Sequence, residues 1–182
     1  MKTLTAKGMI VPKARIGTRI TERANWNLFD ADVLVWHIET GVDVTFLKHL
    51  TDMRFAIEPF AARLASQRAS KDEIEGLYAH AEAMSKADSD ESFAHADLKF
   101  HLALHAASGN PFMLSVGNLI EAALVTSFKM SSPYGETGRH VATANKHRLI
   151  VEAIERKDGE AASAAMEQVI TDGFERISNK LL

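Results

Sequence analysis

The sequence contains no cysteine in its 182 residues. This absence excludes disulfide bonds, zinc sites built from thiolates and cysteine nucleophiles. No apolar run reaches the roughly 20 residues that a membrane-spanning helix needs, and no signal peptide opens the chain. We therefore expect a cytoplasmic protein with no membrane partner.

Apolar residues make up 46% of the chain, which is enough for the core of one domain with a small appendage. Charge is distributed unevenly. Residues 1–23 hold six basic residues and one acidic residue, a net of +5, whereas the rest hold 15 basic and 23 acidic residues, a net of −8. A basic head on an acidic body favours an anionic partner such as nucleic acid, although a solvated basic tail would show the same pattern.

Apolar residues recur at helical spacing from Asp43 onward. The pattern predicts helices over residues 43–67, 71–86, 92–107, 111–130, 139–156 and 159–179, with a loop over 131–138. Short connections favour antiparallel neighbours, so the expected fold class is all-α, an antiparallel bundle of about six helices. Ser70 and Glu73 predict a capping box, and Pro59 predicts a kink near Phe55–Ala56.

The segment before this body has its own signals. Gly8 has the position of a glycine that ends a short helix. Two β-rich runs, Met9–Val11 and Thr18–Thr21, flank PKARIG and indicate a short N-terminal β-hairpin with Gly17 in its turn. Asp30 should cap a short linker helix that ends at Gly41.

Polar residues stand four apart in the segment DLKFHLALHAASGN. Asp97, His101 and His105 therefore lie on one face of the predicted helix. A third group from another helix would complete a metal site with Asp97 and His101, and His147 is a good candidate. An ordinary surface ion pair between Asp97 and His101 would show the same spacing.

Arg54 lies on the apolar stripe of the first long helix, where a charged side chain is costly unless it is paired. Glu58 follows one helical turn later and could be that partner. Alternatively, the guanidinium of Arg54 could hold an anionic ligand inside the bundle.

The N-terminal stretch resembles the end of a winged helix-turn-helix domain of the GntR regulator family. The matching residues are Leu4, Gly8, Met9, Ile10, Arg15, Gly17 and Thr18. In that family the base-reading part of the recognition helix would lie before Met1. The resemblance therefore implies operator DNA as the partner of a full-length form, and weak or no DNA binding by this chain alone.

The body resembles the FCD domain, the effector-binding domain of the FadR-type branch of GntR regulators. Three blocks carry the resemblance: RFAIEPFAARLA (Arg54–Ala65), DLKFHLALHAASGNP (Asp97–Pro111) and HRLIVEAIERKDGEAASAAM (His147–Met166). The linker WNLFDADVLVW (Trp26–Trp36) is similar to the subgroup that responds to sugar acids, the galactonate-type repressors. The expected organisation is a winged-helix remnant over 1–24, a linker helix over 25–42 and an FCD-type domain over 43–182.

The resemblance also implies a site. Asp97, His101 and His147 match three residues that bind a divalent metal in this family, with zinc, nickel or another transition metal as the ion. The family's last histidine would fall at position 169, where this chain has Val169. A bound sugar acid would then complete the coordination shell, or the site is partly degenerate; His105 or His140 could substitute. Arg54, Glu58 and Asn110 are the expected ligand-binding residues.

The expected function is that of a ligand-binding domain in a homodimeric, metabolite-responsive transcription regulator, which binds a small carboxylate and signals to a DNA-binding head. One alternative is a metal-dependent helical-bundle enzyme that acts on a small organic acid. The paired Glu-x-x-His pattern, a nucleophile elbow and phosphate-binding glycines are missing from the sequence, so we expect no enzyme. A pure dimerisation module would leave the polar groups on core faces unexplained.

Overall fold

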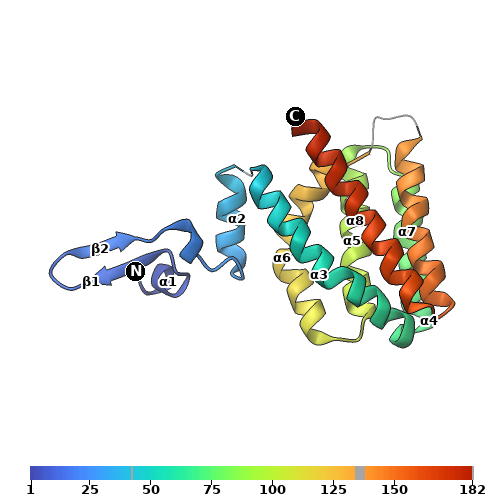
Figure 1. The fold of residues 1–182 in the computed structure, drawn as a ribbon, viewed down its shortest axis with the longest axis horizontal. Coiled ribbons are helices and arrows are strands. Elements are labelled where there is room, and N and C mark those ends of the chain that lie inside the picture. Colours follow the sequence, from blue (N-terminus) through green and yellow to red (C-terminus); the bar gives the residue numbers. More distant parts are fainter. Residues whose placement is uncertain (42, 134–137, 182) are drawn as a thin grey trace. The chain divides into compact units, whose positions relative to one another are not determined.

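The computed structural model describes residues 1–41, 43–133 and 138–181, with the side chains at 119, 120, 122, 180 and 181 left out of the description. Contacts between residues divide the chain into two compact units, Met1–Val42 and Asp43–Leu182. Figure 1 shows the helices and strands of both units.

The first unit holds a short helix, a hairpin and the linker helix. Its elements are α1 (Lys2–Ala6), β1 (Ile10–Lys13), β2 (Gly17–Ile20), the 3-10 helix η1 (Arg23–Asn25) and α2 (Ala31–Glu39). The strands are antiparallel, with Ile10 opposite Ile20 and Lys13 opposite Gly17. The predicted turn PKARIG was too long, because Pro12 and Lys13 belong to β1. Positive φ angles of 64° at Arg15 and 97° at Gly17 let the chain reverse in fewer residues.

Two side chains organise the start of α2. Asp30 caps this helix as predicted, and its Oδ1 accepts hydrogen bonds from the backbone N–H groups of Asp32 and Val33. The Lys7 ammonium, at the end of α1, donates to the carboxylate of Asp30 and, at 2.9 Å, to that of Asp32. These contacts lower the pKa of Asp30 and raise that of Lys7. They tie α1 to the first turn of α2.

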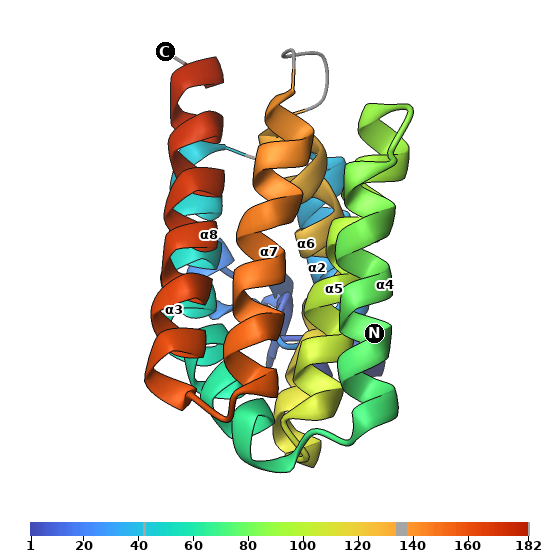
Figure 2. The ribbon, with the colours of Figure 1, turned by 90° about the vertical axis from the view of Figure 1, so that its right-hand side faces the viewer.

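The second unit is a bundle of helices that run up and down beside one another (Figures 1 and 2). Its described helices are α3 (Val44–Arg68), α4 (Lys71–Ser85), α5 (Asp90–Ala107), α6 (Pro111–Ser131), α7 (Arg139–Glu155) and α8 (Gly159–Leu181). Helix α3 packs on α8, α4 lies against α5 and α7, α5 also contacts α6, and α7 also contacts α8. The predicted all-α bundle with an N-terminal hairpin is confirmed.

The helix boundaries follow local hydrogen bonding. The capping box of Ser70 and Glu73 starts α4 as predicted. Helix α5 starts at Asp90 rather than Ser92, because the side chain of Ser89 caps it and accepts from the Ser92 N–H. Helix α3 is assigned without a break through Pro59, and the kink expected near Phe55–Ala56 stays a prediction.

The connection between α6 and α7 was predicted as a loop over residues 131–138. Ser131 belongs to α6 instead, and residues 134–137 lie outside the described part of the chain. Helix α7 begins after Gly138, which has a φ of +72° and no side chain that could cap the helix.

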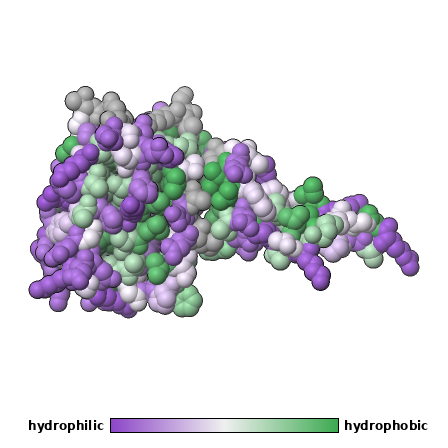
Figure 3. Space-filling view, turned by 180° about the vertical axis from the view of Figure 1, so that it is seen from behind, coloured by the Kyte–Doolittle hydropathy of each residue, from purple (hydrophilic) through white to green (hydrophobic). Residues whose placement is uncertain are grey.

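The core of the bundle is formed by large apolar side chains from α4, α5, α7 and α8. They include Phe93, Phe100, Leu77, Met84, Ile150, Ile154, Met166 and Ile170. Hydrophilic residues cover much of the face of the body in Figure 3, with apolar residues between them. No single described helix is long and apolar enough to cross a membrane; two segments of α6 meet that test only together, across a bend of 70°.

Candidate metal centre

Asp97 and His101 of α5 meet His147 of α7 inside the bundle. The Oδ1 atom of Asp97 lies 3.0 Å from Nε2 of His147 and 3.3 Å from Nε2 of His101. One ligand atom from each residue lies within 4.8 Å of the other two, and all three side chains are buried. The spacing of four within α5 aligns Asp97 with His101, as the sequence indicates. The packing of the bundle adds His147, which lies on α7, 46 residues after His101.

The Nδ1 atoms of His147 and His101 each have a polar neighbour that orients the imidazole ring. Nδ1 of His147 lies 2.9 Å from the backbone carbonyl oxygen of Thr143, one turn earlier in α7. A carbonyl can only accept, so Nδ1 carries a proton, and Nε2 is the nitrogen that faces Asp97. Nδ1 of His101 lies 2.9 Å from Oε2 of Glu58. Histidines that bind metals are typically held in this way, by a carbonyl or a carboxylate at the other nitrogen.

Several buried polar atoms of this group lack a hydrogen bond. Among the described residues, Asp97 Oδ1, His101 Nδ1 and His147 Nε2 are fully buried and make no hydrogen bond of ordinary geometry, despite the short distances. Buried polar atoms are nearly always hydrogen-bonded, so such a cluster calls for an explanation. Two imidazole nitrogens and one carboxylate oxygen are suitable ligands for zinc and for other transition metals. The residues present therefore fit a divalent transition metal.

Arg54 and Glu58 of α3 form the second part of the centre. Arg54 donates from Nε to Oε1 of Glu58 at 2.8 Å and from Nη2 to Oε2 at 3.2 Å, and both side chains are buried. The pair that the sequence offered as one alternative is therefore present. Nη2 of Arg54 also lies 3.4 Å from Nε2 of His101, so a cationic group borders the candidate ligand atoms.

At both carboxylates, Glu58 and Asp97, contacts with neighbouring side chains lower the pKa by more than burial raises it. Burial alone would raise the pKa of the Glu58 carboxyl, but Arg54 and His101 hold that pKa well below its usual range. The same opposition holds the pKa of Asp97 far below its usual range, with His101 and His147 as the cause. Burial lowers the pKa of His101, yet Glu58 and Asp97 together raise it. Both carboxylates are therefore ionised, as metal coordination and ion pairing require.

Two phenylalanines enclose the site, which no sequence pattern predicted. The ring of Phe128 stacks on His101, with centroids 4.9 Å apart and an interplanar angle of 28°, and lies 4.7 Å from the guanidinium carbon of Arg54. Phe100 meets the edge of His147, also at 4.9 Å. These contacts join residues from different helices, which only the fold brings together. The aromatic surroundings exclude water and strengthen electrostatic interactions inside.

The remaining candidates lie elsewhere. His105 is fully buried and burial lowers its pKa, but it is not part of the three-residue group. Asn110 caps α6, where its side-chain oxygen accepts a hydrogen bond from the Phe112 N–H at 3.0 Å. Val169 of α8 is buried in the main apolar core and offers no ligand atom. The expected ligand-binding role of Asn110 stays a prediction, as does a metal role for His105 or His140.

The bundle matches a known domain family. The family model described as the FCD domain matches residues 49–172 of this chain. The chain belongs to the FCD domain family. That match covers α4 to α7 completely and most of α3 and α8, so the candidate metal centre lies inside the FCD domain.

Similar proteins are DNA-binding regulators. The chain is 31% identical to the uncharacterized HTH-type transcriptional regulator YieP of Escherichia coli, over 93% of this chain and 73% of that protein. It is 27% identical to the galactonate operon transcriptional repressor of the same organism, over 97% of this chain and 77% of the repressor. These relatives identify the chain as a transcriptional regulator with an FCD effector-binding domain, and not as an enzyme.

Solved structures share the fold at low sequence identity. The metal-free FCD domain of TM0439 superposes with a TM-score of 0.64 at 20% identity and covers 78% of this chain and 98% of that one. A GntR protein of Streptococcus agalactiae superposes with a TM-score of 0.64 at 22% identity, over 96% of this chain and 78% of its own. These likenesses concern the arrangement of helices.

Proposed function

We propose that this regulator binds a small carboxylate, a sugar acid or another hydroxy acid, at a divalent metal held by Asp97, His101 and His147. One observation carries the proposal: the ligand atoms of these three residues converge in a buried place, where Oδ1 of Asp97 and Nε2 of His147 lack hydrogen bonds. The name of one relative, a galactonate operon repressor, supports a sugar acid as the effector class.

Three protein ligands leave room for the effector on the metal. A structural zinc site usually has four protein ligands, whereas a site with three keeps a position for water or another oxygen. Val169 supplies no ligand at the position where a fourth was expected. A carboxylate oxygen and the hydroxyl beside it would fill the remaining positions, so metal and effector stabilise each other in the bundle.

The charges of the centre suit one carboxylate. Asp97 and Glu58 contribute two negative charges, while Arg54 and a divalent ion contribute three positive ones. The net charge of +1 would be balanced by a monoanionic group placed between the metal and Arg54. Arg54 lies close enough to Nε2 of His101, at 3.4 Å, to reach a group bound at the metal.

The other parts of the chain have roles in signalling. Residues 1–24 correspond to the end of a winged helix-turn-helix head, 25–42 to a linker with helix α2, and 43–182 to the effector-binding domain. Occupancy of the bundle shifts its position relative to α2 and changes the spacing of two heads in a cytoplasmic homodimer.

Metal analysis of three variants tests the metal centre. The wild-type chain should carry about one divalent ion after purification and dialysis, and His101→Ala and His147→Ala should lose it, because each removes a ligand. His95→Ala is the matched control, since His95 lies on the same helix as His101 but is exposed. If both site variants keep the ion at the wild-type level, the assignment is wrong.

A thermal-shift screen tests the effector. Sugar acids should raise the melting temperature of the metal-loaded chain by mass action and should do so less in His147→Ala. An equal shift in the chelator-treated protein would separate ligand binding from the metal and contradict the proposal.

A further inference from the structure

Lys7 differs from the other basic residues of the first unit in its burial. Only 8% of its surface is exposed, whereas the other lysines and the arginines of residues 1–41 are exposed. It is the C-cap residue of α1, so its side chain leaves the chain where that helix ends. A buried ammonium group is costly unless it is paired, and the positions of its partners are therefore constrained.

The partners of the Lys7 ammonium all belong to the start and first turns of α2. It donates to the carboxylates of Asp30 and Asp32, and it lies 5.6 Å from the centroid of the Trp36 ring. Asp32 and Trp36 are one helical turn apart and share a face of α2. A rotation of α2 by one residue, about 100°, would turn both side chains away from Lys7. The contacts of Lys7 therefore fix how α2 is rotated relative to α1.

Backbone contacts beside Lys7 fix the position of the same elements. The Asn27 N–H donates to the Lys7 carbonyl at 3.0 Å. The next residue, Gly8, approaches the backbone oxygen of Asn25 so closely that no Cβ fits, and its carbonyl accepts from the hydroxyl of Thr21 after β2. Residues 7 and 8 thus connect α1 with the hairpin, with η1 and with the segment that leads into α2.

The charge of Lys7 makes this connection specific. The start of a helix is the positive end of its dipole, which disfavours a cation there. Asp30 and Asp32 supply the acidic groups that make Lys7 favourable at the start of α2. An apolar side chain of similar length would fill the same space in several settings of α2. A buried ion pair selects one setting, because any other setting leaves a charge unpaired.

We propose that Lys7, through its contacts with Asp30, Asp32 and Trp36, holds α1, the hairpin and α2 together as one rigid body. A movement of α2 then carries α1 and the hairpin with it, instead of being absorbed at the contact between α1 and α2. This inference rests on the proposed function only for the source of that movement, which is the effector-binding body.

Distance measurement by double electron–electron resonance tests the rigid body. The chain has no cysteine, so nitroxide labels attach only where cysteines are introduced. Thr3→Cys on α1 and Glu39→Cys at the end of α2 are both exposed positions. In the full 182-residue chain, treated with chelator, the labels should give one narrow distance distribution. Lys7→Met should widen it about twofold or more, because α2 then populates several rotational settings.

Two further variants separate the Lys7 contacts from general loss of structure. Lys13→Met removes an exposed lysine of β1 and should leave the distribution unchanged. Asp32→Asn removes one carboxylate but keeps the helix cap of Asp30, so it should widen the distribution less than Lys7→Met does. Backbone NMR signals of the hairpin show whether the first unit is folded. Asp32→Asn decides alone if these signals are lost in Lys7→Met.

A third measurement adds a six-carbon aldonic acid to the metal-loaded chain with the same labels. The distance between α1 and α2 should stay the same, because both helices move together. The inference is overturned by a wide distribution in the otherwise unchanged chain, by equal widths in that chain and in the folded Lys7 and Asp32 variants, or by a shift when the acid is added. If the acid does not bind, the proposed function fails, while the widths in the chelator-treated chain still decide the role of Lys7.

Discussion

The buried charges around His101 depend on one another for their stability. Arg54 pairs with Glu58, Glu58 faces His101, and His101 and His147 share the carboxylate of Asp97. Each member is shielded from water, so removal of one leaves its neighbour as an uncompensated buried charge. In such a group, the loss of one residue affects stability as well as binding.

Replacement of Arg54 should therefore destabilise the fold. Arg54→Met leaves the buried Glu58 carboxylate with His101 as its remaining contact, and the free energy of unfolding should fall by about 3 kcal/mol or more. Arg148→Met, which removes an exposed arginine near Glu82, should change it by less than about 0.5 kcal/mol. Urea denaturation of the three proteins, treated with chelator, gives the comparison. An unchanged midpoint for Arg54→Met would show that Arg54 serves the ligand and not the pair.

Replacement of His105, in contrast to that of Arg54, should stabilise the fold. Among the described residues, neither ring nitrogen of this fully buried side chain has a hydrogen-bond partner. Burial lowers its pKa, so the ring is neutral and its two polar atoms still lose their hydration. His105→Leu should thus raise the free energy of unfolding by about 1 kcal/mol.

The measurement for His105 is denaturation in chelator, with the exposed His95→Leu as the control that should show no gain. A clear loss of stability in His105→Leu would mean that the imidazole nitrogens have partners, such as bound water. A gain accompanied by loss of the effector-induced thermal shift would instead identify His105 as a contact of the ligand.

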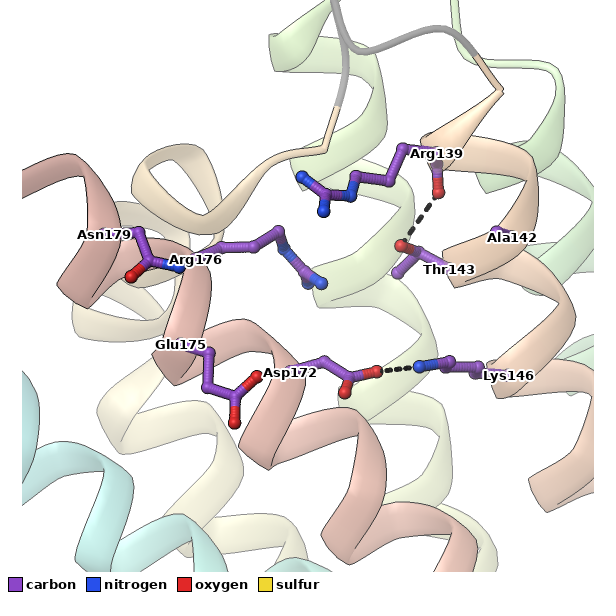
Figure 4. A pocket seen from close by; sticks show the side chains of 8 residues that line it. All are labelled: Arg139, Ala142, Thr143, Lys146, Asp172, Glu175, Arg176 and Asn179. Atoms are coloured by element: carbon purple, nitrogen blue, oxygen red, sulfur yellow. Dashed lines mark hydrogen bonds and ion pairs between the residues drawn. The ribbon is translucent and has the colours of Figure 1, made fainter.

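At the scale of the helices, the sequence predicts which residues of one helix share a face. It does not predict which residues of different helices contact one another. The pairs Asp97–His101 and Arg54–Glu58 follow from intervals of four residues, because each pair lies on one helix face. Phe128 lies 27 residues after His101 and stacks on it only because α6 packs against α5. The pocket lined by Arg139, Lys146, Asp172 and Arg176 (Figure 4) likewise has no sequence signal, because its two walls come from α7 and α8, whose register is set by the fold.

Helix ends were predictable where a cap has its own chemistry. Ser70, Asp30 and Gly8 were assigned from side-chain type alone, and the structure places each at a helix end. The first strand of the hairpin was predicted as Met9–Val11 and was too short, because Pro12 was taken as a turn residue, and the second was predicted one residue too late. Proline is tolerated at the edge of a two-stranded sheet, where its missing N–H faces away from the partner strand.

Gly8 allows a close approach within the first unit. Its φ is +74°, and a Cβ atom there would lie 2.2 Å from the backbone oxygen of Asn25. Gly8→Ala should therefore loosen the junction of α1, β1 and η1, with a strain of about 1–3 kcal/mol. Trypsin should cut at Lys13, Arg15 and Arg19 faster in this variant, while the melting temperature of the body stays the same.

Gly76→Ala is the matched control for that experiment. Gly76 lies in the middle of α4, and a Cβ atom added there meets nothing within 4 Å. The substitution should leave tryptic cleavage of the first unit unchanged and stabilise the helix by up to about 1 kcal/mol. Equal cleavage rates for wild type and Gly8→Ala would contradict the role given to Gly8.

On the scale of the whole molecule, the two units differ in charge and in packing. The basic residues Lys2, Lys13, Arg15, Arg19 and Arg23 of the first unit are exposed, whereas Lys7 is buried against acidic partners. The body carries the excess of acidic residues and the buried polar centre. The first unit thus presents positive charge that suits an anionic polymer, and the second encloses the polar centre at which we propose that a small anion binds.

The 182-residue chain should bind DNA weakly and without sequence preference. Helix α1 has five residues, and five exposed basic residues in its unit can contact phosphates, so charge supplies most of the affinity. The slope of log K against log salt should then be no steeper than about −4.5 per chain, and Arg15→Gln should reduce it by about one. Lys157→Gln, in the body, should leave the slope unchanged.

Fluorescence anisotropy with labelled random duplex at several salt concentrations gives these values. Tight binding to one operator that survives an excess of random duplex would show that the chain reads bases, and a slope equal in wild type and Arg15→Gln would remove the hairpin from the contact surface.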